Sequence, residues 1–167
     1  MSKQVQETAK SHGDDWLSQV IGHDKDKGNI QNWRARDTLP QALLLAGPRG
    51  VGKATLAKAA ALQLSETNQR ADAGNLDTAV HDAPDVWHGT PANTKMESVR
   101  NELFPFLRNA PFVGPRAVVV LEDADAYLTS RQPATGNALL KSLEEPRQRI
   151  HFIITASRPD ALLPTIT

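Results

Sequence analysis

LPQALLLAGPRGVGKATLAKAAALQL, residues 39–64, is the stretch from which the fold can be predicted. Its apolar run from Ala42 to Ala46 predicts the first core strand, and its alanine-rich second half predicts a helix from Lys53 to about Leu64. Between them lies GPRGVGK, which has the complete G-x-x-x-x-G-K spacing. A strand, a glycine-rich loop with lysine and a helix together indicate a phosphate-binding loop, whereas the simpler alternative is a glycine turn before a helix.

The loop supplies two kinds of group that a phosphate needs. Its glycines allow backbone N–H groups to curl around an anion, and the start of the helix adds unpaired N–H groups and the positive end of the helix dipole. Lys53 would place a positive charge on the outer phosphates. The predicted nucleotide-binding residues are Gly47, Gly50, Val51, Gly52, Lys53, Ala54 and Thr55.

Ala54 departs from the pattern. The motif expects Ser or Thr after Gly-Lys, because that hydroxyl ligates Mg²⁺. Thr55 is one residue later and would point about 100° away on a helix. We therefore expect ATP or ADP to bind weakly, with doubtful Mg²⁺ ligation.

Composition limits the classes of function. The 167 residues suit one domain, and 19 basic residues balance 19 acidic ones, so no net charge attracts nucleic acid or membrane. The chain has no cysteine, which excludes disulfides and thiolate zinc sites, and its five histidines lack metal-ligand spacing, so we expect them in loops or on the surface. No apolar run has membrane-spanning length, and a cytoplasmic protein is expected.

Strands and helices alternate along the rest of the chain. Further strands are predicted at residues 85–88, 117–121 and 150–155. Helices are predicted to about Trp33 with Asp24 as the capping residue, from near Asn93 with a kink or a restart at Pro105, and from Pro133 to Glu144 or Glu145. This order predicts an α/β fold with a mostly parallel sheet flanked by helices, preceded by a flexible tail over residues 1–14.

Polar residues follow two of the predicted strands. Glu122 and Asp123 end the run AVVVL, where one acid of a phosphate-loop ATPase holds Mg²⁺ and the next orients the attacking water. Glu122 is therefore the candidate metal ligand and Asp123 the candidate catalytic acid, although a solvated acidic strand end is the alternative. Thr155 and Ser157 follow the last strand and could contact the terminal phosphate, or could be turn residues.

These segments together resemble the AAA+ clamp-loader subunits, with closest similarity to the delta-prime subunits of bacterial DNA polymerase III. The resemblance is carried by WLSQVIGHD (16–24), the loop stretch, HDAPDVWHGTP (81–91), VVVLEDADAYL (118–128), NALLKSLEEP (137–146) and LLPTI (162–166). It implies a partial AAA+ domain over residues 15–167, ending before the last core strand and the helical lid.

The resemblance also implies roles for the site residues. Gly47, Gly50, Gly52 and Lys53 correspond to Walker A, Glu122 and Asp123 to Walker B, and Thr155 or Ser157 to the sensor position. The family's cysteine-bound zinc is not expected, because residues 65–84 contain no cysteine.

The implied function is that of a clamp-loader stator with a degenerate ATP site, whose partners are other clamp-loader subunits and, indirectly, the sliding clamp and primed DNA. Two alternatives stay open at this stage. One is an active Mg-ATP-hydrolysing clamp-loader ATPase, and the other is a small-molecule phosphotransferase with a phosphate loop.

Overall fold

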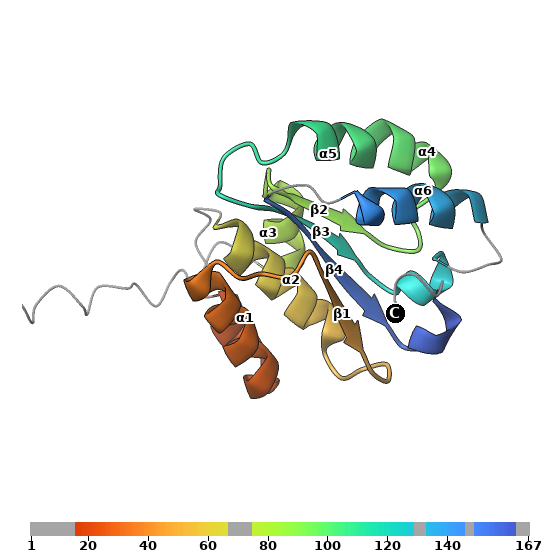
Figure 1. The fold of residues 1–167 in the computed structure, drawn as a ribbon. Coiled ribbons are helices and arrows are strands. Elements are labelled where there is room, and N and C mark those ends of the chain that lie inside the picture. The colour runs from red at the N-terminus through yellow and green to blue at the C-terminus, as the bar shows by residue number, and fades with distance from the viewer. Residues whose placement is uncertain (1–15, 67–74, 129–132, 146–148, 163–167) are drawn as a thin grey trace, which may run out of the picture.

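The computed structural model describes residues 16–66, 75–128, 133–145 and 149–162, and these residues form three layers (Figure 1). The central layer is a parallel sheet of β1 (Ala42–Ala46), β2 (Val86–Gly89), β3 (Ala117–Leu121) and β4 (Ile150–Ala156) in the order β1-β4-β3-β2. The predicted parallel α/β fold is confirmed, and β1 lies at one edge of the sheet. The predicted tail and the end of the LLPTI segment lie outside the described residues.

Helices cover both faces of the sheet (Figure 1). One face carries α1 (Asp24–Arg36), α2 (Lys53–Ser65) and α3 (Leu76–Asp82). The other face carries a continuous run of α4 (Met96–Ser98), a π-helical turn (Val99–Leu103) and α5 (Phe104–Asn109), beside α6 (Pro133–Glu144). Short 3₁₀ turns occur at Trp16–Gln19, Ala124–Ala126 and Pro159–Ala161. None of the helices in the described part of the chain is long and apolar enough to span a membrane.

β3 is the centre of the core, because all five of its residues are buried. Side chains alternate across a strand, so Val118 and Val120 pack under α2 and α3, while Val119 and Leu121 pack under α5 and α6. A strand buried on both faces needs an uninterrupted apolar run, and AVVVL supplies one.

Two helix boundaries differ from the sequence-based expectation. The residue that precedes α1 is His23 rather than Asp24, and it adopts a left-handed conformation with φ 55° and ψ 34°. Pro105 lies in the first turn of α5, directly after the π-helical turn, and its ring nitrogen has no hydrogen to donate to a carbonyl of that turn, so the irregularity predicted at Pro105 takes the form of the π-helical turn. Val99, Leu103 and Leu107 are buried on one face of this helical run.

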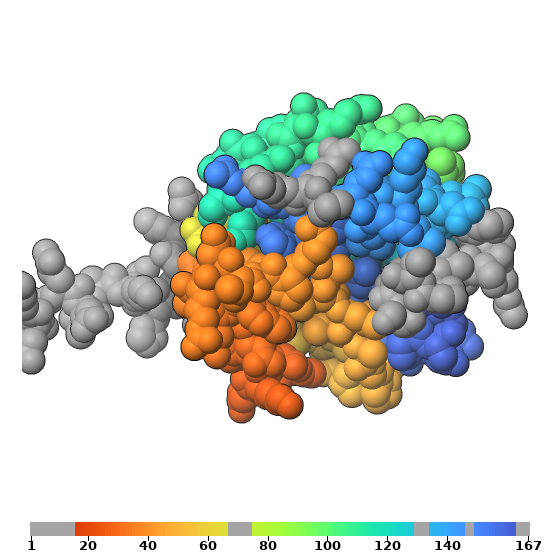
Figure 2. All heavy atoms as spheres, viewed as in Figure 1, coloured from red at the N-terminus to blue at the C-terminus, as the bar shows by residue number. Residues whose placement is uncertain are grey.

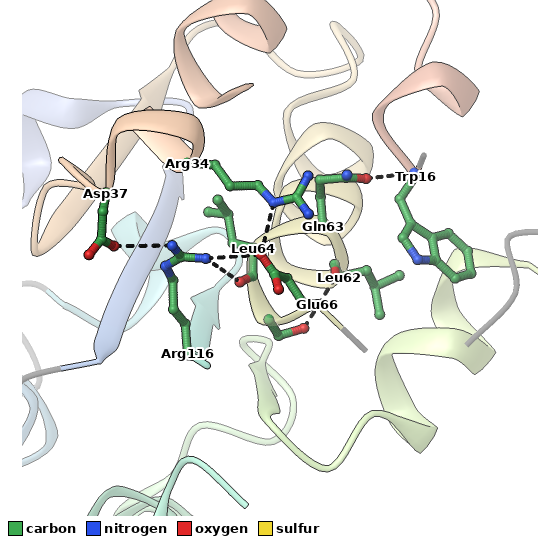
Figure 3. A network of polar contacts seen from close by, with 9 residues as sticks. Trp16, Arg34, Asp37, Leu62, Gln63, Leu64, Glu66 and Arg116 are labelled. Carbon is green, nitrogen blue, oxygen red and sulfur yellow. Dashed lines mark hydrogen bonds and ion pairs between the residues drawn. The ribbon is translucent and has the colours of Figure 1, made fainter. Parts of the chain in front are cut away.

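Polar contacts join the helices to the sheet at the end opposite the phosphate loop (Figure 3). Arg116, which precedes β3, donates to Asp37 Oδ1 at 3.1 Å and to both Leu64 O and Glu66 Oε1 at 3.4 Å. Arg34 Nε reaches the same Glu66 oxygen at 3.2 Å. This network ties the ends of α1 and α2 to the start of β3.

The first 3₁₀ turn is fastened to the same end of α2. Trp16 and Leu17 are buried in the core, and Trp16 N–H donates to Gln63 Oε1 at 2.9 Å (Figure 3). The Gln63 side chain therefore satisfies a buried backbone donor, which would otherwise destabilise the fold.

Asp85 holds the turn that leads into β3. Its buried carboxylate accepts hydrogen bonds from the backbone N–H groups of Phe112, Val113 (3.0 Å) and Gly114 (2.5 Å). Gly114 lies against the end of α2, where an added Cβ would be only 2.0 Å from Ser65 O. The turn therefore needs both the acceptor at position 85 and the missing side chain at position 114.

We expect Asp85→Ala to lower the free energy of unfolding by about 3 kcal/mol or more, since it leaves three backbone donors without their acceptor. Urea unfolding measures this change. The matched control is Asp82→Ala, whose side chain is 58% exposed and which should change stability by less than about 0.5 kcal/mol. Equal effects of the two substitutions would contradict the role given to Asp85.

Candidate phosphate-binding site

A cavity of about 440 Å³ opens at the carboxyl ends of the strands. Most of the predicted site residues line it: Gly50, Gly52, Lys53, Ala54, Thr55, Glu122, Asp123, Thr155 and Ser157. Gly47 and Val51 are not part of the lining, whereas Arg49, which the sequence analysis did not single out, is. The chain thus brings its glycine-rich loop, its acidic strand end and its hydroxyl residues to one place.

The loop has the backbone conformation that its glycines predicted. Gly50 and Gly52 have φ of 82° and 87°, which other residues adopt only with strain. Gly47 N–H donates to Ala156 O at 3.2 Å and so fastens the loop to the end of β4. In Figure 2 the loop and the start of α2 (light orange) lie beside the segment that follows β4 (blue).

The start of α2 presents backbone donors to the cavity. Its first intrahelical bond runs from Leu56 N–H to Gly52 O, so the N–H groups of Lys53, Ala54 and Thr55 precede the helical ladder. Such groups carry the partial positive charge of the helix dipole and suit an anion. Ala54 keeps this donor although it lacks a hydroxyl.

Lys53 is buried and folds back over the loop. Its ammonium donates to Gly47 O at 2.5 Å and to Pro48 O at 2.7 Å. The charge therefore lies at the base of the loop, and a phosphate entering the cavity would compete with these carbonyls for the ammonium protons.

Glu122 is engaged by a histidine that the sequence analysis assigned to the surface or a loop. His88 Nε2 lies 2.7 Å from Glu122 Oε2, and because an ionised carboxylate only accepts, the ring nitrogen is the donor. Both side chains are only about one fifth exposed, at 22% and 21%. His88 pairs in register with Val120, two residues before Glu122, so the two side chains share a face of the sheet.

Asp123 is held differently from Glu122. It adopts a left-handed conformation, with φ 50° and ψ 48°, and its N–H donates to Thr155 Oγ1 at 2.9 Å. The buried Thr155 hydroxyl therefore links the ends of β3 and β4. Ser157 also lines the cavity, and its buried Oγ has no hydrogen-bond partner within the described residues.

Tyr127 forms a hydrogen bond with the backbone at the acidic strand end. Its hydroxyl donates to Glu122 O at 3.0 Å. Burial raises the pKa of the Tyr127 phenol, and the neighbouring carboxylates Glu122, Asp123 and Asp125 raise it further. The phenol consequently stays protonated and serves as a permanent donor.

The residues present fit a phosphate-bearing ligand better than they fit its metal ion. The loop, Lys53 and the start of α2 offer donors, as a phosphate requires. Ala54 has no side-chain oxygen that could ligate Mg²⁺, and Glu122 Oε2 already accepts a hydrogen bond from His88. In the part of the chain that the structure describes, no group of three or more His, Cys, Asp or Glu side chains is placed to hold a metal ion.

Comparisons with known proteins point to one group. A family model described as DNA polymerase III, delta subunit, matches residues 22–167. The chain is 36% identical to the DNA polymerase III subunit delta' of Pseudomonas aeruginosa over 138 residues, covering 75% of this chain and 40% of that protein. It is 31% identical to the DNA polymerase III subunit gamma/tau of Mycoplasma pneumoniae over 155 residues, covering 90% of this chain and 22% of that protein. The chain thus spans less than half the length of these relatives.

Solved structures share the fold at lower identity. A DNA polymerase III gamma subunit-related protein from Thermotoga maritima superposes with a TM-score of 0.59 and 19% identity, covering 82% of this chain and 42% of that chain. The AAA domain of FIGL-1 superposes with a TM-score of 0.62 and 16% identity, covering 90% and 51%. These similarities confirm the AAA fold.

Replacing Thr155 by Val should lower the free energy of unfolding by about 1–3 kcal/mol, because Asp123 N–H then loses its buried acceptor while the side-chain volume is kept. Thr155→Ser, which retains the hydroxyl, should lose less. Thermal or urea unfolding of the pair checks this. A Ser variant no more stable than the Val variant would show that the hydroxyl is not what matters.

Proposed function

Since the chain belongs to the DNA polymerase III, delta subunit family and is a clamp-loader-type AAA+ protein, we propose that it acts as a delta-prime-like stator in loading the sliding clamp on primed DNA. In this role the phosphate loop is a structural part with a degenerate ATP site. The observation that carries the proposal is Ala54, which removes the Mg²⁺-ligating hydroxyl from an otherwise complete loop.

The surroundings of Ala54 support weak metal chemistry. Glu122, the Walker B acid that would hold Mg²⁺, accepts a hydrogen bond from His88. Phosphate binding depends less on side chains, since the N–H groups of the loop and of α2 come from the backbone. We therefore expect a nucleotide to bind weakly and to be hydrolysed negligibly. Asp123 should accordingly contribute little to catalysis.

An active Mg-ATPase is the competing candidate, and one observation favours it: Thr55 lines the cavity, so its hydroxyl could stand in for the missing ligand. We do not propose a small-molecule phosphotransferase, because the family to which the chain belongs is a replication family.

The proposed partners are the other clamp-loader subunits, with the sliding clamp and primed DNA reached through them. The balanced charge, 19 basic against 19 acidic residues, supports assembly through protein contacts rather than a general attraction to DNA. Bacterial replication takes place in the cytoplasm, where we accordingly infer that the chain works.

ATP and ADP should bind the unmodified chain about equally well with and without Mg²⁺, and Ala54→Thr should make binding Mg²⁺-dependent by about ten- to a hundredfold. A restored oxygen on a charged group contributes about 1.5–3 kcal/mol. Titration of fluorescent ATP and ADP, with hydrolysis followed in parallel, measures both. Tight Mg²⁺-dependent binding with turnover by the unmodified chain would favour the active ATPase instead.

Association with a gamma/tau-type subunit from the same genome tests the partner proposal. We expect the two proteins to elute as one complex in size-exclusion chromatography at micromolar concentration. Ala54→Thr should leave the complex intact, because the proposed stator role does not depend on metal chemistry. Separate elution of the full-length proteins would count against this function.

A further inference from the structure

His23 makes the contact that couples the N-terminal segment to the phosphate loop. Its Nε2 lies 2.6 Å from Val51 O, across 28 positions of sequence. A carbonyl oxygen only accepts, so Nε2 carries the hydrogen and donates it. His23 lies outside the G-x-x-x-x-G-K motif, and the sequence analysis expected it to lie in a loop or on the surface.

The backbone around His23 is positioned so that its ring reaches the loop. His23 occupies a left-handed conformation just before α1, and its carbonyl accepts from Lys27 N–H at 2.9 Å as the helix begins. The Lys27 ammonium donates to Val20 O, which holds the preceding turn, and Asp26 Oδ2 lies 3.7 Å from His23 Nδ1. The histidine side chain is only 23% exposed. His23 is therefore held in position by these contacts and is not part of an unrestrained loop.

The ring also packs on the last glycine of the loop. A Cβ placed on Gly52 would lie 3.4 Å from His23 Nε2, which is a tight contact. The peptide between Val51 and Gly52 is thus held on one side by a hydrogen bond and by ring contact. Because a trans peptide is planar, its C=O and N–H point in opposite directions. Fixing the carbonyl toward His23 directs the Gly52 N–H away from the ring.

This direction matters because Gly52 lines the cavity, whereas His23 and Val51 lie outside that lining. The Gly52 N–H, a donor that a phosphate needs, is therefore oriented by a contact on the side of the loop away from the cavity. Gly52, with φ 87°, has no Cβ to restrict its rotation, so the contact with His23 adds a restraint that a side chain of its own cannot supply.

We propose that His23 is a positioning residue of the phosphate loop, which orients the Val51–Gly52 peptide and so raises the affinity of the site for the phosphates of a nucleotide. The inference rests on the proposed nucleotide site. It places the residue that controls phosphate affinity on the segment before α1, outside the G-x-x-x-x-G-K motif.

Two substitutions separate the donor from the ring. His23→Phe keeps an aromatic ring against Gly52 and removes the donor, whereas His23→Gln places an amide nitrogen the same number of bonds from Cα as Nε2. Loss of one hydrogen bond predicts ATP and ADP affinity about two- to tenfold lower in His23→Phe, measured without Mg²⁺, with most of it restored in His23→Gln. His81→Phe is the control, since the His81 side chain is 87% exposed on α3.

A second measurement works without nucleotide. Backbone ¹⁵N relaxation of the full chain should show the amides of Gly50 and Gly52 as rigid, with order parameters of about 0.85. In His23→Phe the Gly52 value should fall toward about 0.6, and His23→Gln should recover it.

The two measurements distinguish the proposals. If the unmodified chain binds neither ATP nor ADP, the nucleotide site of the proposed function fails, and the relaxation data alone judge His23. Unchanged order parameters in His23→Phe would overturn the inference. So would unchanged affinity in a chain that does bind nucleotide, or equal effects from His81→Phe.

Discussion

β3 is enclosed on all sides, by β2 and β4 within the sheet and by a helical layer above and below, and this enclosure dictates where polar groups can appear. A strand with five buried residues has no place for a charged side chain until it ends. Glu122 and Asp123 stand at the first positions beyond it. Their neighbours on the adjacent strands, His88 and Thr155, are equally close to a strand end, so the four meet at one edge.

Local sequence signals explain how much of the fold was predictable. The strands Ala42–Ala46 and Ala117–Leu121 agree with the structure residue for residue, because their signal is a local apolar run. The helix expected to end near Trp33 continues to Arg36, since its end depends on the left-handed conformation of Asp37, which no local pattern announced.

The residues that line the cavity were predictable from the sequence, whereas the contacts among them were not. Glycine spacing and acidic strand ends are local signals, and they located nearly all of the cavity lining. His23 and His88 were missed because their partners, Val51 and Glu122, are 28 and 34 residues away. Only the order of strands in the sheet and the path of the chain before α1 bring these groups together. The position of His88 beside β3 would have required knowing that β2 and β3 are neighbours in parallel register.

α2 connects the phosphate loop at one end of the molecule to the polar contacts at the other end. Its 13 residues make a rod about 20 Å long. At one end Gln63 accepts from Trp16, and at the other the loop before the helix accepts from His23 through Val51. One short segment, residues 16–23, thus forms hydrogen bonds at both ends of α2. Because Arg116 also bonds Leu64 O and Glu66 Oε1 at the far end of α2, a shift of this helix along its axis would break contacts at both of its ends.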